Sequence, residues 1–178
     1  VSNIPAFDLN PVTNVPFKLN KVDKIATAGS CFAQEIAKSL KEKGFYYFVS
    51  EKIPENISSE TAIKRNYDVY SARYGNIYTA RQLRQLIERV YDNFSPDLPV
   101  WQRADGKYVD PFRPQIEPEG FLSEADLVLS RKEHLQSVKE LFENLDVFMF
   151  TLGLTEGWLH KASGAVLPIA PGVSGGEW

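Results

Sequence analysis

The stretch that decides the fold is residues 24–49, KIATAGSCFAQEIAKSLKEKGFYYFV. A short apolar segment, residues 24–28, runs directly into Gly29-Ser30-Cys31. A helix is expected to follow, because the next apolar residues share one face at helical spacing: Phe32, Ala33, Ile36, Ala37 and Leu40. Gly44 predicts the end of that helix, and the aromatic and β-branched residues 46–49 are typical of a second strand. A strand, a helix and a strand in this order predict a parallel sheet.

Two further helices and one further strand are expected downstream. The capping-box pattern TARQ at residues 79–82 predicts one helix start, and Ser130 with Glu133 predicts the other. Residues 147–152, VFMFTL, follow the second helix and are apolar at nearly every position, which is typical of a central parallel strand covered on both faces. The connections 51–78 and 93–123 show no strong periodicity. Residues 1–23 are expected to form an irregular arm, followed by one α/β domain over residues 24–178.

Composition and charge narrow the class of protein. The chain has 178 residues, a net charge of −3 and 43% apolar residues, which fits one soluble globular domain and gives no reason to expect a nucleic-acid partner. No apolar run is long enough to cross a bilayer. One cysteine permits a reducing compartment, so we expect a cytoplasmic protein, although a leader removed before Val1 is compatible with the sequence. Two distant histidines and one cysteine form no metal-ligand motif, and no cofactor is expected.

Gly29-Ser30-Cys31 is the first candidate site. A strand that ends here and starts a helix places Ser30 and Cys31 at a helix N-terminus, where free N–H groups and the helix dipole stabilise a thiolate or an oxyanion. Of the two, Cys31 is the stronger nucleophile. The alternative is structural: Ser30 caps the helix and Cys31 is a small buried residue. Spacing alone favours this alternative.

The second candidate site is Gly153-Leu154-Thr155-Glu156, directly after the predicted strand 147–152. Both segments follow strand ends, so both are expected at the carboxyl edge of the sheet. Thr155 offers a hydroxyl donor, and Glu156 offers a base or an orienting carboxylate. Taken alone, these residues favour another helix start with Thr155 as its cap. His134 is expected to be a half-buried packing residue, and His160 lies in a predicted loop.

Several blocks of the sequence resemble the GSCFA-domain family of bacterial proteins. Gly-Ser-Cys-Phe-Ala at residues 29–33 is the signature that gives this family its name. Further similar blocks follow in the same order: YGNIYTARQL at 74–83, VDPFRP at 109–114, FTLGLTEGW at 150–158, and Pro171-Gly172-Val173 with Gly175-Gly176. The resemblance spans nearly the whole chain beyond the N-terminal arm.

The family is grouped with the SGNH, or GDSL-like, hydrolases, and this grouping implies a three-layer fold with a parallel sheet flanked by helices, as in flavodoxin. The resemblance puts Cys31, rather than Ser30, at the nucleophile position of the Gly-Asp-Ser motif. It suggests Gly75 for the glycine that follows the second strand. The Gly-x-Asn-Asp block falls on residues 153–156, beginning at Gly153, so that Thr155 replaces the oxyanion-binding Asn. Asn76 is a second candidate for that amide.

The resemblance implies an esterase or acyltransferase that acts on an acylated glycan or another small-molecule ester, with no membrane partner. The alternative is a binding or structural module that keeps the fold and has lost the chemistry. The superfamily's catalytic His follows two further strands, which this sequence does not contain. We therefore expect a fold truncated after its third core strand, a fragment that is inactive alone, and an exposed sheet flank that favours self-association.

Overall fold

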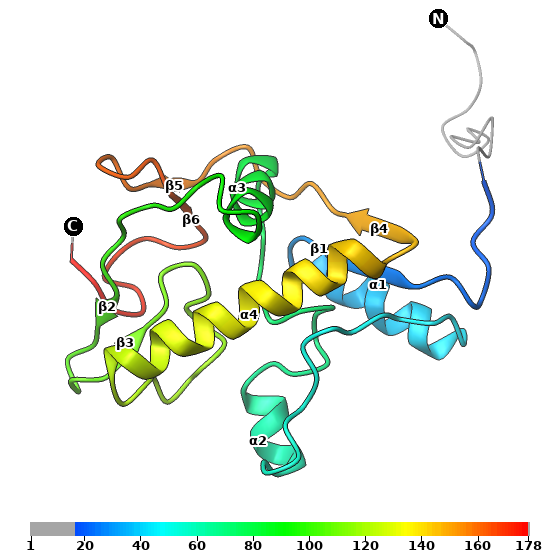
Figure 1. Ribbon diagram of the computed structural model, residues 1–178, viewed down its shortest axis with the longest axis horizontal. Helices are drawn as coiled ribbons and strands as arrows, with labels where there is room; N and C mark the ends of the chain where they lie inside the picture. The colour runs from blue at the N-terminus through cyan, green and yellow to red at the C-terminus, as the bar shows by residue number, and fades with distance from the viewer. Residues whose placement is uncertain (1–16, 178) are drawn as a thin grey trace, which may run out of the picture.

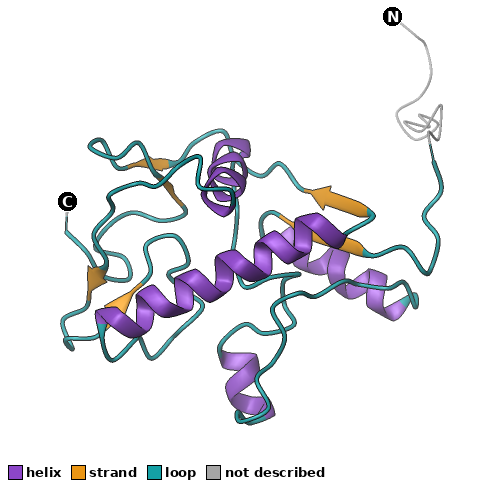
Figure 2. Cartoon of the chain, viewed as in Figure 1, coloured by secondary structure: helices purple, strands orange, loops and turns teal. Residues whose placement is uncertain are grey.

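A computed structural model of the chain describes residues 17–177 and shows a mixed α/β arrangement of four helices and small sheets (Figure 1). The helices are α1 (Cys31–Glu42), α2 (Ser59–Lys64), α3 (Ala80–Val90) and α4 (Glu124–Asn144). The strands are β1 (Ile25–Ala28), β2 (Trp101–Gln102), β3 (Tyr108–Val109), β4 (Val147–Phe150), β5 (Trp158–Leu159) and β6 (Val166–Leu167). Long loops join these elements, and α4 is the longest of the helices (Figure 2).

The central element is β1, which pairs in parallel with β4. The register places Ile25 beside Val147 and Ala28 beside Phe150. On its other side β1 makes one parallel bridge, between Ile25 and Tyr47. The strand predicted at residues 46–49 is therefore reduced to a single bridge. Beyond this bridge the Ser50 N–H donates to the Ser71 carbonyl oxygen at 2.9 Å, so it does not pair with β1.

Helices pack on both faces of the β1–β4 pair. On one face Ile25 packs with Ala37 and Leu40 of α1. On the other face Ala26 and Ala28 pack with α3 and α4 through residues such as Leu86, Val138 and Leu141. This division follows from the alternation of side chains along a strand. All four residues of β1 are buried because both faces are covered.

The prediction that residues 147–152 form the central strand is wrong, because β1 rather than β4 has a neighbour on each side. β4 ends at Phe150, all four of its residues are only half-buried, and within residues 17–177 it pairs with β1 alone. Its apolar side chains do reach both faces, with Phe148 and Phe150 on the α4 side and Val147 and Met149 on the α1 side. An apolar run indicates that both faces of a strand are packed, but it does not indicate how many strands pair with it.

The predicted helix starts at Ser30 and Thr79 are confirmed, and the one at Ser130 is wrong. Ser30 caps α1, and Thr79 with Gln82 forms the capping box of α3. α4 begins seven positions earlier than the sequence predicted, since its cap is Ser123 and Ser130 lies inside the helix. Val128 and Leu129 in the first turns are apolar but exposed, so the apolar residues there do not follow one helix face and the helix start is hard to see in the sequence.

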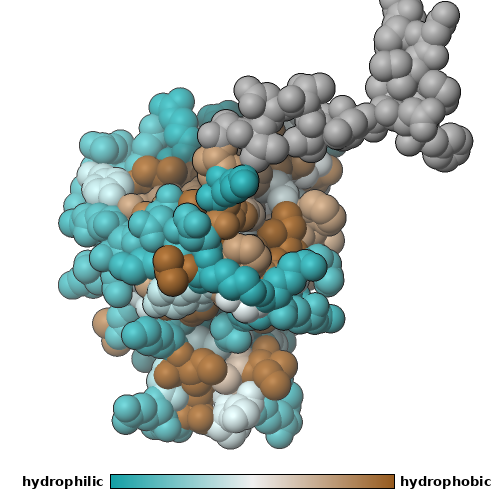
Figure 3. All heavy atoms as spheres, turned by 90° about the vertical axis from the view of Figure 1, so that its right-hand side faces the viewer, coloured by the Kyte–Doolittle hydropathy of each residue, from teal (hydrophilic) through white to brown (hydrophobic). Residues whose placement is uncertain are grey.

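The connections contain more structure than the sequence predicted. Residues 51–78 include α2, and residues 93–123 include the antiparallel pair of β2 and β3. β5 and β6 form another antiparallel pair. No helix within residues 17–177 is long and apolar enough to span a membrane. Most of the predicted arm, residues 1–16, lies outside the described residues. The face in Figure 3 mixes hydrophilic and hydrophobic groups.

Candidate active site

Three segments meet where β1 and β4 end. The Thr151 N–H donates to the Ala28 carbonyl oxygen at 3.0 Å, and the Ile77 N–H donates to the Gly29 carbonyl oxygen at 2.8 Å. The Leu154 N–H donates to the Tyr78 carbonyl oxygen at 2.9 Å. These backbone bonds tie together the β1–α1 turn, residues 77–78 and residues 151–154. The sequence predicted that the first and the last of these would meet at one edge.

The turn itself requires glycine at position 29. Gly29 has φ +144°, a region that is strained for any other residue, and a Cβ there would overlap the Thr151 side chain. Gly153 lies on the other side of the turn, where a Cβ would be 3.6 Å from the Ser30 Cβ. The predicted site residues Ser30 and Gly153 are therefore neighbours in space.

Cys31 is the first residue of α1, and its side chain is exposed. The prediction that it is a buried filler is therefore wrong. Ser30 does act as the cap, because its Oγ accepts a hydrogen bond from the Phe32 N–H at 3.4 Å. The first turn of a helix has N–H groups without intrahelical acceptors, so the thiol lies beside a site that favours negative charge.

A polar network that the sequence did not predict lies beside α1. Gln34 is one turn along the helix from Cys31, and its Nε2 donates to the Tyr70 hydroxyl at 2.8 Å and to the Asn76 Oδ1 at 3.1 Å. Tyr70 also donates to the Asn76 Oδ1 at 3.2 Å. The Asn76 Nδ2 donates to the Tyr78 hydroxyl at 3.1 Å. Because its oxygen is held by two donors, the Asn76 amide has a fixed orientation and keeps one N–H free of these bonds.

Tyr70 links this network to the thiol electrostatically. Burial is the main cause that raises the pKa of the Tyr70 hydroxyl to about 12, and Tyr78 and Cys31 contribute to the same shift. Tyr70 is therefore a protonated hydrogen-bond donor at neutral pH. A signal for this role was present in the sequence as a tyrosine close to the predicted Asn76, but a tyrosine in an irregular connection is not distinctive.

The remaining predicted residues are not all brought to Cys31. Thr155 and Glu156 are exposed in a segment without regular structure, so the predicted helix start at Thr155 is wrong. Thr155 lies two residues beyond Gly153, and hence near the edge that contains Ser30. Gly75 has φ +70° and open space at its Cβ position. It lines a small cavity with Asn76, Phe112 and Arg113, and Cys31 does not line that cavity.

Exposed apolar side chains surround the edge. Phe32 is 63% exposed on the first turn of α1, and Leu152 and Leu154 are 76% and 55% exposed beside Gly153. Exposed apolar side chains next to the thiol in sequence and beside Gly153 form a surface suited to an apolar group.

The described residues place neither histidine against Cys31. The His134 Nδ1 lies 2.7 Å from the Glu51 Oε2, and the His160 Nδ1 lies 2.7 Å from the Ser163 Oγ. His134 on α4 is fully buried, whereas the sequence predicted a half-buried residue. Burial and the nearby Arg113 lower its pKa to about 4, so the ring is neutral at pH 7.

His134 belongs to a buried cluster of charged groups that the sequence did not reveal. Asp110 pairs with Arg113 at 3.0 Å and with Arg131 at 2.9 Å, and Glu51 lies 3.6 Å from Arg73. Burial raises the pKa of Asp110, but the surrounding arginines lower it well below its usual range. Asp110 and Arg113 stand three residues apart in the block VDPFRP, so the pair had a visible spacing but no distinctive partner.

A separate cleft of about 670 Å³ lies at the β5–β6 end of the chain. Its walls include Trp101, Trp158 and His160. None of the predicted catalytic or oxyanion-binding residues lines it. In Figure 1 the β5–β6 pair and the β1–β4 pair lie on opposite sides of α3.

Comparison with known protein families matches residues 24–174 to the GSCFA family. Searches of curated proteins and of solved structures found no match. The matched region contains the glycine-dependent turn, the segments at the strand ends and the buried ionic cluster. The resemblance seen in the sequence blocks is thereby confirmed, and the chain belongs to the GSCFA family.

Proposed function

We propose that the protein is an acyl-transferring or ester-cleaving enzyme of the SGNH type, with Cys31 as its nucleophile. The observation that carries this proposal is the exposed thiol at the first position of α1, beside the tied ends of β1 and β4. SGNH-type enzymes have a parallel sheet between helices, and the helices on both faces of the β1–β4 pair are consistent with that three-layer architecture.

The chemistry uses two steps. The Cys31 sulfur attacks the ester carbonyl carbon, the carbonyl oxygen becomes an oxyanion, and the carbon–oxygen bond to the alcohol then breaks. The alcohol leaves with the proton that the thiol gives up, and a thioester remains on Cys31. Water or an acceptor hydroxyl attacks this thioester, which releases an acid or a new ester and restores the thiol. Attack by water is hydrolysis, and attack by an acceptor hydroxyl is acyl transfer.

In this proposal the Cys31 N–H holds the oxyanion together with Asn76 or Thr155, and the Gly75 N–H, which lies on a cavity that Cys31 does not line, contributes only if the substrate reaches that cavity. Asn76 is the better supported amide, because Gln34 and Tyr70 fix its oxygen and leave an N–H group to donate. Gly153 keeps the turn close to Ser30, and Glu156 is the candidate base or orienting carboxylate. The exposed Phe32, Leu152 and Leu154 favour an ester with an apolar acyl group, on a glycan or another small molecule.

The test compares two reactions of the same thiol. Acylation by p-nitrophenyl acetate passes through an oxyanion, whereas alkylation by iodoacetamide does not. Asn76→Leu is expected to slow acylation about 100-fold, because one oxyanion donor is worth a factor of about 10² to 10³, and to leave alkylation unchanged. Cys31→Ala should lose both reactions, as detected by mass spectrometry of the adduct.

Two outcomes contradict the proposal. One is a thiol that reacts with neither reagent, since an exposed nucleophile should react with both. The other is acylation that falls in parallel with alkylation in Asn76→Leu, since this indicates a change in exposure rather than in oxyanion binding. Gln102→Leu, an exposed amide away from the turn, is the matched control.

The second candidate function is a binding module without catalysis. It is favoured by one observation: the aromatic cleft near Trp158 lies apart from Cys31. Its volume of about 670 Å³ falls within the usual range of small-molecule sites. A ligand that shifts the Trp158 fluorescence equally in the wild type and in Cys31→Ala, with no acylation of either, supports this function instead.

A further inference from the structure

A small cavity lies between α3, α4 and the segment 112–113, and cationic side chains form part of its wall. Its lining includes Arg89, Arg113, His134, Tyr74 and Phe112. Its volume is about 30 Å³, which is room for one small ion or about two waters. Asn76, the proposed oxyanion donor, also lines this cavity. The inference drawn below rests on Arg89, Arg113 and His134, which have no role in the proposed acyl transfer.

Three buried polar atoms on the cavity-lining residues have no hydrogen-bond partner within residues 17–177. They are the Arg89 Nη2, the Arg113 Nη1 and the His134 Nε2. The exposed fractions of these residues are 9%, 2% and 1%. Buried polar groups nearly always have a partner, because an unpaired one costs free energy. Three of them around one cavity therefore point to a ligand.

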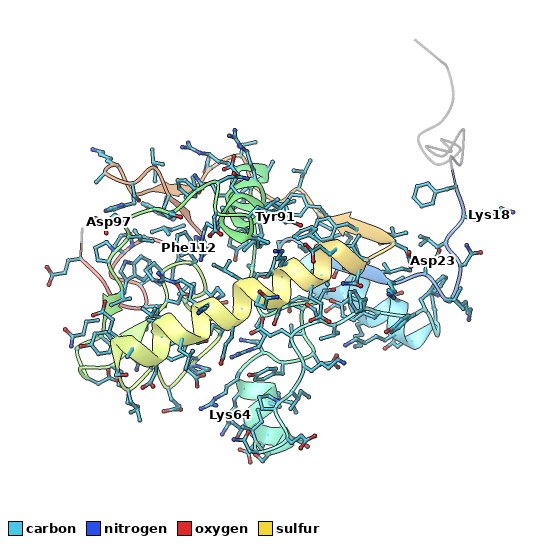
Figure 4. The ribbon with its side chains drawn as sticks, viewed as in Figure 1. Lys18, Asp23, Lys64, Tyr91, Asp97 and Phe112 are labelled. Carbon is cyan, nitrogen blue, oxygen red and sulfur yellow. The ribbon has the colours of Figure 1, made fainter. Side chains whose placement is uncertain are left out.

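The surroundings of Arg89 indicate that this ligand carries a negative charge. Its guanidinium stacks on the Phe112 ring at 3.6 Å, but no carboxylate among the described residues forms an ion pair with it. Asp110, the buried carboxylate that acts electrostatically on Arg89, is already paired with Arg113 and Arg131. In Figure 4 Phe112 lies near α3 and α4, which contribute Arg89 and Arg131 to its two ring contacts.

The electrostatic effect on Arg89 agrees with this reading. Burial lowers the pKa of Arg89 to about 9, and the positive charges of Arg131 and Arg113 add to that effect, while Asp110 opposes it. A negative ligand beside the guanidinium would remove most of this penalty, because a buried charge is tolerated when it is paired.

We propose that this cavity binds a small monovalent anion, of the size of chloride or formate, between Arg89 and Arg113. Both guanidinium groups line the cavity and have one nitrogen without a hydrogen-bond partner among the described residues, although the Arg113 Nη1 also lies 3.9 Å from the Glu51 Oε1. His134 donates its Nδ1 proton to Glu51, so its Nε2 becomes a third donor when the ring takes up a proton together with the anion. The groups that face this ring are Glu51, Arg113, Arg89 and Tyr74.

The first experiment measures thermal unfolding at constant ionic strength while sodium chloride or sodium formate replaces sodium gluconate, whose anion is too large for the cavity. A saturable rise in Tm of roughly 3–6 °C is expected once the anion exceeds its Kd about tenfold. Arg89→Met should abolish the anion dependence. Arg84→Met is the matched control, because Arg84 lies exposed on the same helix and pairs with Glu88. An unchanged Tm of the wild type in both salts overturns the proposal.

The second experiment keeps the proposal testable if Arg89→Met fails to fold. Wild-type crystals soaked in sodium bromide are expected to show an anomalous peak within about 3.5 Å of both the Arg89 Nη2 and the Arg113 Nη1. Bromide bound only at the surface, with water in the cavity, contradicts the proposal.

Discussion

Gly29 and Thr151 are packed so closely that no side chain fits between them. Thr151 follows β4 and its N–H bonds to Ala28, while Gly29 follows β1 with φ +144°. This contact brings the two strand ends together and so sets the position of Cys31 relative to residues 151–154. The candidate active site therefore depends on a backbone contact between residues that are far apart in the sequence.

Replacing Gly29 should destabilise the whole fold. Gly29→Ala combines an unfavourable φ with an overlap against Thr151, and we expect a loss of at least about 3 kcal/mol in the free energy of unfolding. Gly106→Ala is the control, since Gly106 also has a positive φ, +82°, but has open space at its Cβ position. It should lose only about 1–2 kcal/mol. Urea denaturation measures both, and equal losses would show that the contact with Thr151 has no energetic effect.

Stability should fall in acid because of the Glu51–His134 pair. Burial lowers the pKa of His134 to about 4 from its ordinary 6.5, so the unfolded state binds this proton more readily. Burial alone would raise the pKa of Glu51, but His134, Arg113 and the Arg73 N–H lower it to about 2. Both depressed pKa values make stability complete above about pH 6.5 and progressively lost towards pH 2, with about 3 kcal/mol from His134 between pH 6.5 and 4.

Urea midpoints across this pH range check the acid effect. Glu51→Gln should remove the part of the stability loss that protonation of this carboxylate causes between pH 4.5 and 2. Glu60→Gln should keep the wild-type profile, because Glu60 is largely exposed in its pair with Lys64. A wild-type midpoint that is constant from pH 7 to pH 4 would disprove the assignment.

The buried carboxylate Asp110 should matter far more than an exposed one. Asp110→Asn leaves Arg113 and Arg131 without their negative partner, and a loss of about 3–5 kcal/mol is expected. Asp105→Asn breaks an exposed pair with Arg103 and should cost less than about 1 kcal/mol. Thermal denaturation of the two variants measures both losses. Equal losses would contradict the prediction, because they would mean that the Asp110 pairs are as well screened by water as the exposed Asp105 pair.

The start of α4 can be tested by removing single hydroxyl groups. The Ser123 Oγ accepts a hydrogen bond from the Asp126 N–H at 3.1 Å, so Ser123→Ala should cost about 1 kcal/mol. The Ser130 Oγ accepts a hydrogen bond from the Arg113 Nη2 at 3.4 Å, so Ser137, which also lies inside α4 and bonds to the Glu133 carbonyl oxygen, is the control. Ser137→Ala should change stability by only a few tenths of a kcal/mol. A loss in Ser123→Ala no larger than the loss in Ser137→Ala would contradict the cap at Ser123.

The sequence by itself determined the local features at the turn. Gly29, the cap at Ser30 and the apolar face of α1 act over a few residues, and the capping box of Thr79 and Gln82 is equally local. The parallel direction of the sheet was also predicted from residues 24–49, because a helix between two strands brings the second strand back in the same direction, and the bridge between Ile25 and Tyr47 is parallel. The family resemblance came from sequence blocks and is confirmed.

Only the tertiary structure decided which side chains meet. The network of Gln34, Tyr70 and Asn76 and the cluster around Asp110 join residues whose separation in the chain follows no period. The predicted strand around Tyr47 is reduced to one bridge, and the Ser50 N–H beyond it bonds to the distant Ser71 carbonyl oxygen. Local propensity contains no information on such contacts, because their free energy arises only after distant segments have packed.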